Sequence, residues 1–144
     1  MEVNLSTIDL LRLFSDFGML VLIWLVQMVI YPSFTFYKKE NFLKWHEVYM
    51  KNSPLVIIPL MLGQLILVCL QLYFIQNTYT LVSLAIVFIL WGHTFYQFAP
   101  LHNAIKNDLN PAKITSELVK FNWWRTFFWT VLFVYSFFKL VVFG

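Results

Sequence analysis

Arg125 has the most conspicuous chemistry in the chain, because it lies inside the aromatic stretch "NWWRTFFW". A charged side chain within an apolar segment is costly, so its first interpretation is functional. The planar guanidinium suits an oxyanion or a phenolate. Asn122 and Trp129 lie three residues before and four residues after it, so a helix places all three on one face. We expect Arg125 to point inward and to share a site with Tyr31, Gln97 or Asn122. The alternative is a guanidinium that reaches lipid phosphates while its stem packs on tryptophans.

Several polar side chains lie at one of two depths within the apolar segments. Depth is counted in residues from the end of each segment that adjoins a lysine-rich connection. A shallow layer contains Tyr31, Gln97 and Arg125, and a deep layer near the middle of the segments contains Gln27, Gln64 and His93. We expect the deep residues to contact one another or a common water. We also expect the polar stripes to meet in a seam inside a helical bundle, rimmed by His46, His102 and Asn103. The alternative is that each amide only links neighbouring helices.

The three histidines raise the question of catalysis or metal binding. His93, His102 and Arg125 are the candidate catalytic residues, with a histidine exchanging protons and Arg125 holding an anion. A metal site of two histidines and one carboxylate would use His46, Glu47 and His102, although no HxxH or CxxC spacing is present. Haem would need two histidines at matching depth, whereas His93 and His102 are nine residues apart and lie on opposite helix faces. No cofactor is favoured.

The elements that must hold these residues follow from composition. Of 144 residues, 60% are hydrophobic and 12% are charged, and the mean hydropathy is +0.73, which indicates an integral membrane protein. We predict one all-α domain over residues 1–144, a four-helix bundle with spans near 12–36, 54–75, 80–101 and 121–143. Ser53 before Pro54 predicts the start of the second span. The net charge of +3 is small and the charged residues are scattered, which argues against nucleic-acid binding. Cys69 is expected to be a buried apolar residue.

Orientation follows from the lysines, because short loops rich in basic residues stay in the cytoplasm. The two longer connections, 37–53 and 102–120, contain Lys38, Lys39, Lys44, Lys51, Lys106, Lys113 and Lys120, and the short turn at 76–79 contains none. We therefore predict two longer cytoplasmic loops, a short outer turn and both termini outside, with a bacterial inner membrane as the location. Residues 38–51 are expected to form an aromatic and basic anchor, or alternatively an amphipathic helix at the interface.

Three stretches, "WHEVYMKNSPLVIIPLML", "TFYQFAPLHNAI" and "NWWRTFFW", give the chain a family resemblance. In order and spacing they resemble small four-helix bacterial membrane proteins that are similar to the anthrone-oxygenase-like family. The resemblance implies a four-helix bundle whose characterised relatives oxidise a fused-ring aromatic substrate without a well-defined metal cofactor. By position, Asn103 and Arg125 match polar positions of the family, while Asn122 stands where a histidine is expected.

These observations predict a polar, aromatic-lined pocket within the membrane and open to the cytoplasmic side. It would bind, and in one version oxidise, a small aromatic or quinone-like molecule, so enzymatic activity is left open. Besides the polar residues of the two layers, Asn103 and Asn122 would contact the ligand, and Phe98, Trp124 and Trp129 would stack on it. One alternative is a non-enzymatic subunit or assembly factor of a larger membrane complex, and another is a protein that binds haem or a metal. Apart from the lipid bilayer, a second copy of the chain is a further candidate partner.

Overall fold

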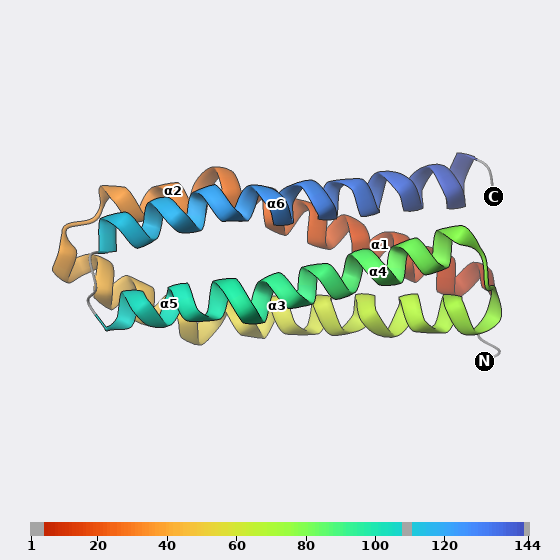
Figure 1. Cartoon of the computed structure of the whole chain (residues 1–144), viewed down its shortest axis with the longest axis horizontal. Helices are drawn as coiled ribbons and strands as arrows, with labels where there is room; N and C mark the ends of the chain where they lie inside the picture. Colours follow the sequence, from red (N-terminus) through yellow and green to blue (C-terminus); the bar gives the residue numbers. More distant parts are fainter. Residues whose placement is uncertain (1–4, 108–110, 143–144) are drawn as a thin grey trace.

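The computed structural model describes residues 5–107 and 111–142, which form an elongated bundle of four long helical segments (Figure 1). Within these residues, four stretches are long and apolar enough to cross a membrane: Thr7–Phe36, Lys39–Phe74, Thr78–Lys106 and Ala112–Val142. Helices satisfy their backbone hydrogen bonds internally, which a lipid environment demands. The predicted all-α fold with four potential membrane spans is confirmed.

Three of the four segments, the first, the third and the fourth, contain a π-helical turn. The first segment consists of α1 (Leu5–Leu25), η1 (Val26–Ile30), α2 (Tyr31–Ser33) and η2 (Phe34–Phe36), and the second is α3 (Lys39–Phe74). The third consists of α4 (Thr78–His93), η3 (Thr94–Phe98) and α5 (Ala99–Lys106), and the fourth of α6 (Pro111–Phe137) and η4 (Phe138–Val142). The π-helical turns η1 and η3 lie just before Pro32 and Pro100. A proline clashes with the carbonyl four residues earlier, and a local widening of the helix relieves that clash.

The predicted start of the second span is wrong. The helix α3 begins at Lys39, so Pro54 lies inside it and residues expected to form a loop are helical. The longer helix places Phe42 and His46 one turn apart on one face, and both are buried. That burial outweighs the start signal at Ser53, since a membrane helix tolerates an internal proline.

The connections predicted to be long loops are short, because the helices extend into them. The third segment continues to Lys106 and α6 begins at Pro111, so residues 107–110 connect them, and residues 37–38 connect the first two segments. The first segment also begins earlier than predicted, at Leu5. Residues expected to flank the membrane are thus part of the bundle itself.

The bundle is a ring in which each segment packs on two neighbours. The helix α1 contacts α3 and α6, and α4 also contacts α3 and α6. The start of α1, the end of the fourth segment and the turn at residues 75–77 lie at one end, which we call the turn end, and the other two connections lie at the loop end (Figure 1). Asn77 caps α4, because its Oδ1 accepts a hydrogen bond from the Thr80 amide at 3.0 Å while the Thr80 hydroxyl accepts one from the Asn77 amide.

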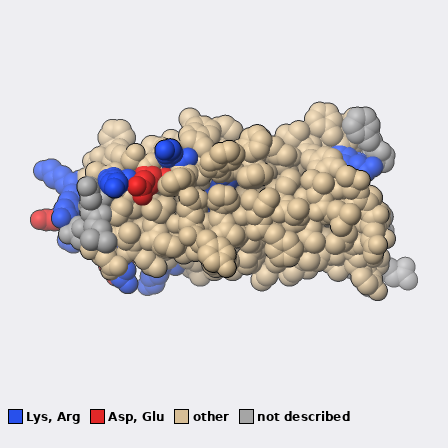
Figure 2. Space-filling model, in the orientation of Figure 1, with Lys and Arg blue, Asp and Glu red and all other residues tan. Residues whose placement is uncertain are grey.

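The surface between the two ends is apolar. Figure 2 shows charged side chains gathered at the loop end, a smaller basic patch near the turn end, and an uncharged surface between them on the face in view. Large apolar side chains are exposed along the helices, for example Phe14 (65%) and Leu55 (73%), as expected for residues that face lipid. Cys69 is exposed as well, which corrects the expectation that it is buried.

A buried ion pair in the half of the bundle nearer the turn end was not anticipated. Arg12 and Asp16 lie four residues apart on α1, and Arg12 Nε donates to both carboxylate oxygens at 2.9 Å. The pair is fully buried. Its other partners come from α3, α4 and α6, and we call the whole set the ion-pair network: Asp9, Arg12, Asp16, Gln64, Gln71, Tyr79, Trp129 and Ser136. It ties all four helical segments together.

The Asp16 carboxylate is the centre of this network. It accepts hydrogen bonds from Gln64 Nε2 at 2.6 Å and from the Ser136 hydroxyl at 2.5 Å, in addition to those from Arg12. Arg12 Nη1 in turn donates to Gln71 Oε1 at 2.8 Å. A buried carboxylate is stable only when its lone pairs are satisfied in this way. The network therefore fixes the rotation of α1, α3 and α6 about their axes.

Candidate functional site

Arg125 points into the bundle, as predicted. It is buried (6% exposed), and its Cζ lies 4.3 Å from the Phe98 ring centroid and 5.1 Å from the Trp129 ring centroid. Nη1 donates a long hydrogen bond of 3.4 Å to Asn122 Oδ1. Aromatic faces attract a cation, so they compensate in part for its desolvation. Trp124 lies on the exposed side of α6, which corrects the expectation that it lines the site.

Arg125 lacks an anionic partner within the described part of the chain. No carboxylate there forms an ion pair with it, and Arg125 Nε is a buried donor without a hydrogen-bond acceptor. Glu47 is exposed and lines a hollow that Arg125 does not line. Asp108, a further carboxylate of the loop that precedes α6, is outside the described residues. A buried cation with so few partners is costly, and an anion beside it would lower that cost.

An apolar cavity of about 250 Å³ lies beside Arg125, between α3 and the third helical segment. Most of its lining is apolar, with Met61, Trp91 and Phe98 among the lining residues. Among its polar lining residues, Tyr31, His102 and Arg125 are buried, and Tyr49, Ser53 and Thr94 are half-buried. Trp91 Nε1 is a second buried donor that has no acceptor among the described residues. An apolar body with a few convergent polar groups is the usual composition of a small-molecule site.

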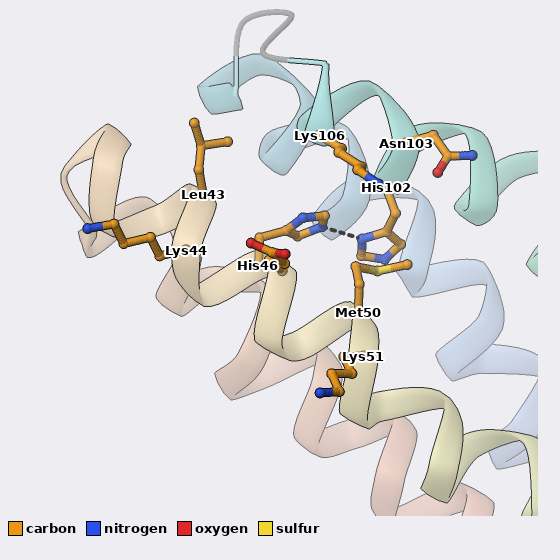
Figure 3. A pocket seen from close by; sticks show the side chains of 9 residues that line it. Leu43, Lys44, His46, Met50, Lys51, His102, Asn103 and Lys106 are labelled. Carbon is orange, nitrogen blue, oxygen red and sulfur yellow. Dashed lines mark hydrogen bonds between the residues drawn. The ribbon is translucent and has the colours of Figure 1, made fainter.

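The cavity reaches the apolar surface of the bundle. Ile58 and Phe95 both line it, and they are 56% and 58% exposed on the apolar surface. The charged residues of the loop end, by contrast, surround a second hollow of about 490 Å³, which we call the loop-side hollow. Its lining comprises Leu43, Lys44, His46, Glu47, Met50, Lys51, His102, Asn103 and Lys106 (Figure 3). His102 and Met50 line both hollows, so they lie at the boundary between them.

His46 on α3 and His102 on α5 meet at this boundary (Figure 3). His46 Nε2 and His102 Nδ1 are 2.9 Å apart and share a hydrogen bond, and the two rings lie nearly parallel. The other ring nitrogen, His102 Nε2, is 3.2 Å from the Tyr31 hydroxyl. All three side chains are buried. The continuous helix α3 is what brings His46 inside the bundle, because a loop at residues 37–53 would not fix its direction.

The predicted direct contact among Gln27, Gln64 and His93 is wrong, because each side chain finds other partners, and the alternative of a common water stays a prediction. Gln27 Oε1 accepts from Asn122 Nδ2 at 2.9 Å, while Gln64 belongs to the ion-pair network. His93 Nδ1 bonds Gln97 Oε1 one turn along its own helix, at 2.9 Å, and both side chains are only half-buried. Equal depth along a helix does not determine its rotation, so residues at one level can face different neighbours.

The metal site considered from the sequence is only partly assembled. His46 and His102 come together, and Glu47 and Asn103 line the same hollow. Among the described residues, however, no group of three or more histidine, cysteine, aspartate or glutamate side chains is arranged to hold a metal ion.

Tyr49 and Trp91 are residues of the cavity that the sequence interpretation missed. Tyr49 lies three residues after His46, a spacing that marks one helix face once residues 39–53 are known to be helical. Trp91 lies in an apolar run in which nothing distinguishes it from other lipid-facing aromatics. In comparisons with family models, curated proteins and solved structures, the chain has no significant match. The resemblance to the anthrone-oxygenase-like proteins remains a prediction that rests on three short motifs.

Proposed function

We propose that the protein binds a small amphipathic molecule with an acidic oxygen, such as a phenol or a quinone-like compound that bears a hydroxyl group, in the cavity beside Arg125. The observation that carries the proposal is the buried Arg125 guanidinium, which has no carboxylate partner among the described residues and lines an apolar cavity. An oxyanion on the guanidinium would supply the missing counter-charge, and the apolar body would fill the cavity.

The donors around the cavity support an oxygen ligand. Arg125 Nε and Trp91 Nε1 are both buried N–H groups with no acceptor among the described residues, and both residues line this one cavity. A charge-assisted hydrogen bond to Arg125 would be short and strong in such a dry site. Phe98 offers an aromatic face beside the guanidinium, so a ring is a suitable body for the ligand.

The bilayer is the proposed source of the ligand. Exposed Ile58 and Phe95 at the cavity belong to the apolar surface, whereas exposed charged residues border the loop-side hollow. An amphipathic molecule dissolved in lipid could therefore enter between α3 and η3 with its acidic oxygen first. The described side chains around the cavity can exchange protons with a phenol, but none of them accepts electrons. The proposed function is accordingly binding with proton exchange, without oxidation by the protein's own side chains.

Binding of 4-nitrophenol tests this function. With the protein in lipid nanodiscs, we expect 4-nitrophenol to bind about 10- to 100-fold more tightly than its neutral methyl ether, 4-nitroanisole, because a hydrogen bond to a charged group contributes about 1.5 to 3 kcal/mol. Equilibrium dialysis against empty nanodiscs measures both affinities and subtracts partition into lipid. Equal affinities would refute the anion site. Binding of neither probe, together with copurification of other membrane proteins, would favour a subunit of a larger complex.

We also propose that the loop end faces the cytoplasm and the turn end faces outward, because the lysines gather at the loop end. Gln76 is exposed in the turn at residues 75–77 and takes no part in the α4 cap. In a Cys69→Ser background, a cysteine introduced by Gln76→Cys should react with an impermeant thiol reagent applied to the outside of intact cells. A cysteine introduced by Glu40→Cys, at the loop end, should react only after the membrane is opened, and the reverse pattern would invert the topology.

A further inference from the structure

We propose that Tyr31, His102 and His46 form a proton relay that connects the Arg125 cavity with the loop-side hollow. The inference rests on the proposed function, since the relay would carry the proton of the acidic oxygen that binds at Arg125. It adds a pathway and a direction for the proton to a binding site whose lining is mostly apolar.

The three residues form one unbroken chain of hydrogen bonds. The Tyr31 hydroxyl lies 3.2 Å from His102 Nε2, and His102 Nδ1 lies 2.9 Å from His46 Nε2. Both ring nitrogens of His102 are thus engaged, one on each side. Tyr31 lines the cavity, His102 lines both hollows, and His46 lines only the loop-side hollow. The chain therefore begins at the ligand and ends at a hollow bordered by charged residues.

Each member of the chain can accept one proton and pass on another. The acidic ligand gives its proton to the Tyr31 oxygen, and the Tyr31 hydroxyl proton moves to His102 Nε2. The proton on His102 Nδ1 then moves to His46 Nε2, and His46 releases its Nδ1 proton to water in the loop-side hollow. At the end, Tyr31, His102 and His46 carry as many protons as before, both histidines have changed tautomer, and one proton has left the ligand.

The charges around the relay favour transfer of the proton through the histidines and disfavour a histidine that stays protonated. Arg125 on α6 lines the cavity at the Tyr31 end, together with the Tyr49 hydroxyl. At the His46 end, the hollow is bordered by one acidic residue and three basic ones: Glu47, Lys44, Lys51 and Lys106. This excess of positive charge disfavours a lasting positive charge on the histidines and favours release. It also favours the ionised ligand at Arg125. On the bilayer side, the exposed rim residues Ile58 and Phe95 have no proton to exchange.

Stopped-flow mixing with 4-nitrophenol tests the relay. With the protein in nanodiscs and an impermeant pH dye in the medium, wild-type protein should release a proton in step with the appearance of the bound phenolate. His46→Ala should leave the equilibrium affinity for 4-nitrophenol unchanged, because His46 does not line the cavity. It should slow proton release by about 100-fold, which is the effect of losing one positioned proton-transfer group. Added imidazole should restore the rate.

Two further variants make the result specific. His46→Gln keeps a hydrogen-bonding side chain that does not take up a proton, so it should be as slow as His46→Ala and should keep the bundle packed. His93→Ala is the matched control: among the described residues the His93 side chain bonds Gln97 on its own helix, so this variant should release protons at the wild-type rate. Imidazole rescue distinguishes proton transfer from a structural role, which a small soluble base would not restore.

The outcomes separate the relay from the binding function. If 4-nitrophenol binds with the expected preference over 4-nitroanisole but His46→Ala and His46→Gln release protons at the wild-type rate, the relay is wrong and the binding function stands. Slow release without rescue by imidazole would also overturn the relay. If wild-type protein does not bind 4-nitrophenol, the binding function is wrong and the relay fails with it.

Discussion

Asp16→Asn is expected to lower the free energy of unfolding by about 3 to 5 kcal/mol, because it leaves a buried guanidinium without its counter-charge. Asp16 and Arg12 are both fully buried, and the carboxylate also accepts hydrogen bonds from Gln64 and Ser136. An asparagine at this position replaces one acceptor oxygen with an amide donor. That donor would face the donors of Arg12, Gln64 and Ser136, with which it forms no hydrogen bond. Reversible unfolding in mixed detergent micelles measures the loss.

A control and a double variant make this prediction specific. Glu40→Gln removes an exposed carboxylate and should change stability by no more than about 0.5 kcal/mol. The double variant Arg12→Met with Asp16→Leu removes both charges and should recover most of the loss, since apolar replacement of a whole buried pair is often neutral or stabilising. A loss below about 1 kcal/mol for Asp16→Asn would mean that water reaches the pair and that the network does not hold the segments together.

Unlike Asp16→Asn, Arg125→Met is expected not to lower stability. It should abolish the preference for 4-nitrophenol over 4-nitroanisole. Replacing Arg125 removes a buried charge that has no carboxylate partner among the described residues, so stability should stay equal or rise. The affinity for 4-nitrophenol should fall by about 10- to 100-fold, and the affinity for 4-nitroanisole should not fall. Arg12→Met, which strands Asp16, should instead destabilise the protein. The two buried arginines are thus distinguished by one pair of unfolding curves.

Arg125→Lys tests whether binding needs only a positive charge or also the planar shape of the guanidinium. A lysine keeps the positive charge but loses the planar fork and the contact with the Phe98 ring, so binding of 4-nitrophenol should be intermediate between wild type and Arg125→Met. Unchanged binding in Arg125→Met would show that the probe binds elsewhere. Loss of stability in Arg125→Met would assign Arg125 a structural role, with Asn122 as its main partner.

The inward position of Arg125 could be predicted because several weak signals agreed. The arginine, Asn122 and Trp129 share one face of a regular helix, and Asn122 and Arg125 are strongly polar groups within an otherwise aromatic stretch. The number of helices could also be predicted, because hydropathy reports directly on the length of an apolar segment.

The histidine pair and the ion-pair network could not be predicted in the same way. Both depend on where a helix begins. A boundary at Pro54 places His46 in a loop, whereas a start at Lys39 places it on the inner face of α3. A boundary at residue 12 places Arg12 and Asp16 at the membrane surface, whereas a start at Leu5 brings both inside. The spacing of Arg12 and Asp16, opposite charges four residues apart, is the signal in the sequence that could have indicated this pair. It indicates a buried pair only once the helix is known to begin before residue 12.

The absorption spectrum of bound 4-nitrophenol tests the central claim most directly, because it reports the charge of the ligand oxygen at the site. At a pH at which the free probe is mainly protonated, the fraction bound to wild-type protein should show the phenolate band, since Arg125 stabilises the anion. The same fraction bound to His93→Ala should show that band as well, and Arg125→Met should remove it. A neutral phenol spectrum for the wild-type complex would contradict the account, because it would mean that the buried guanidinium does not hold an anion in this cavity.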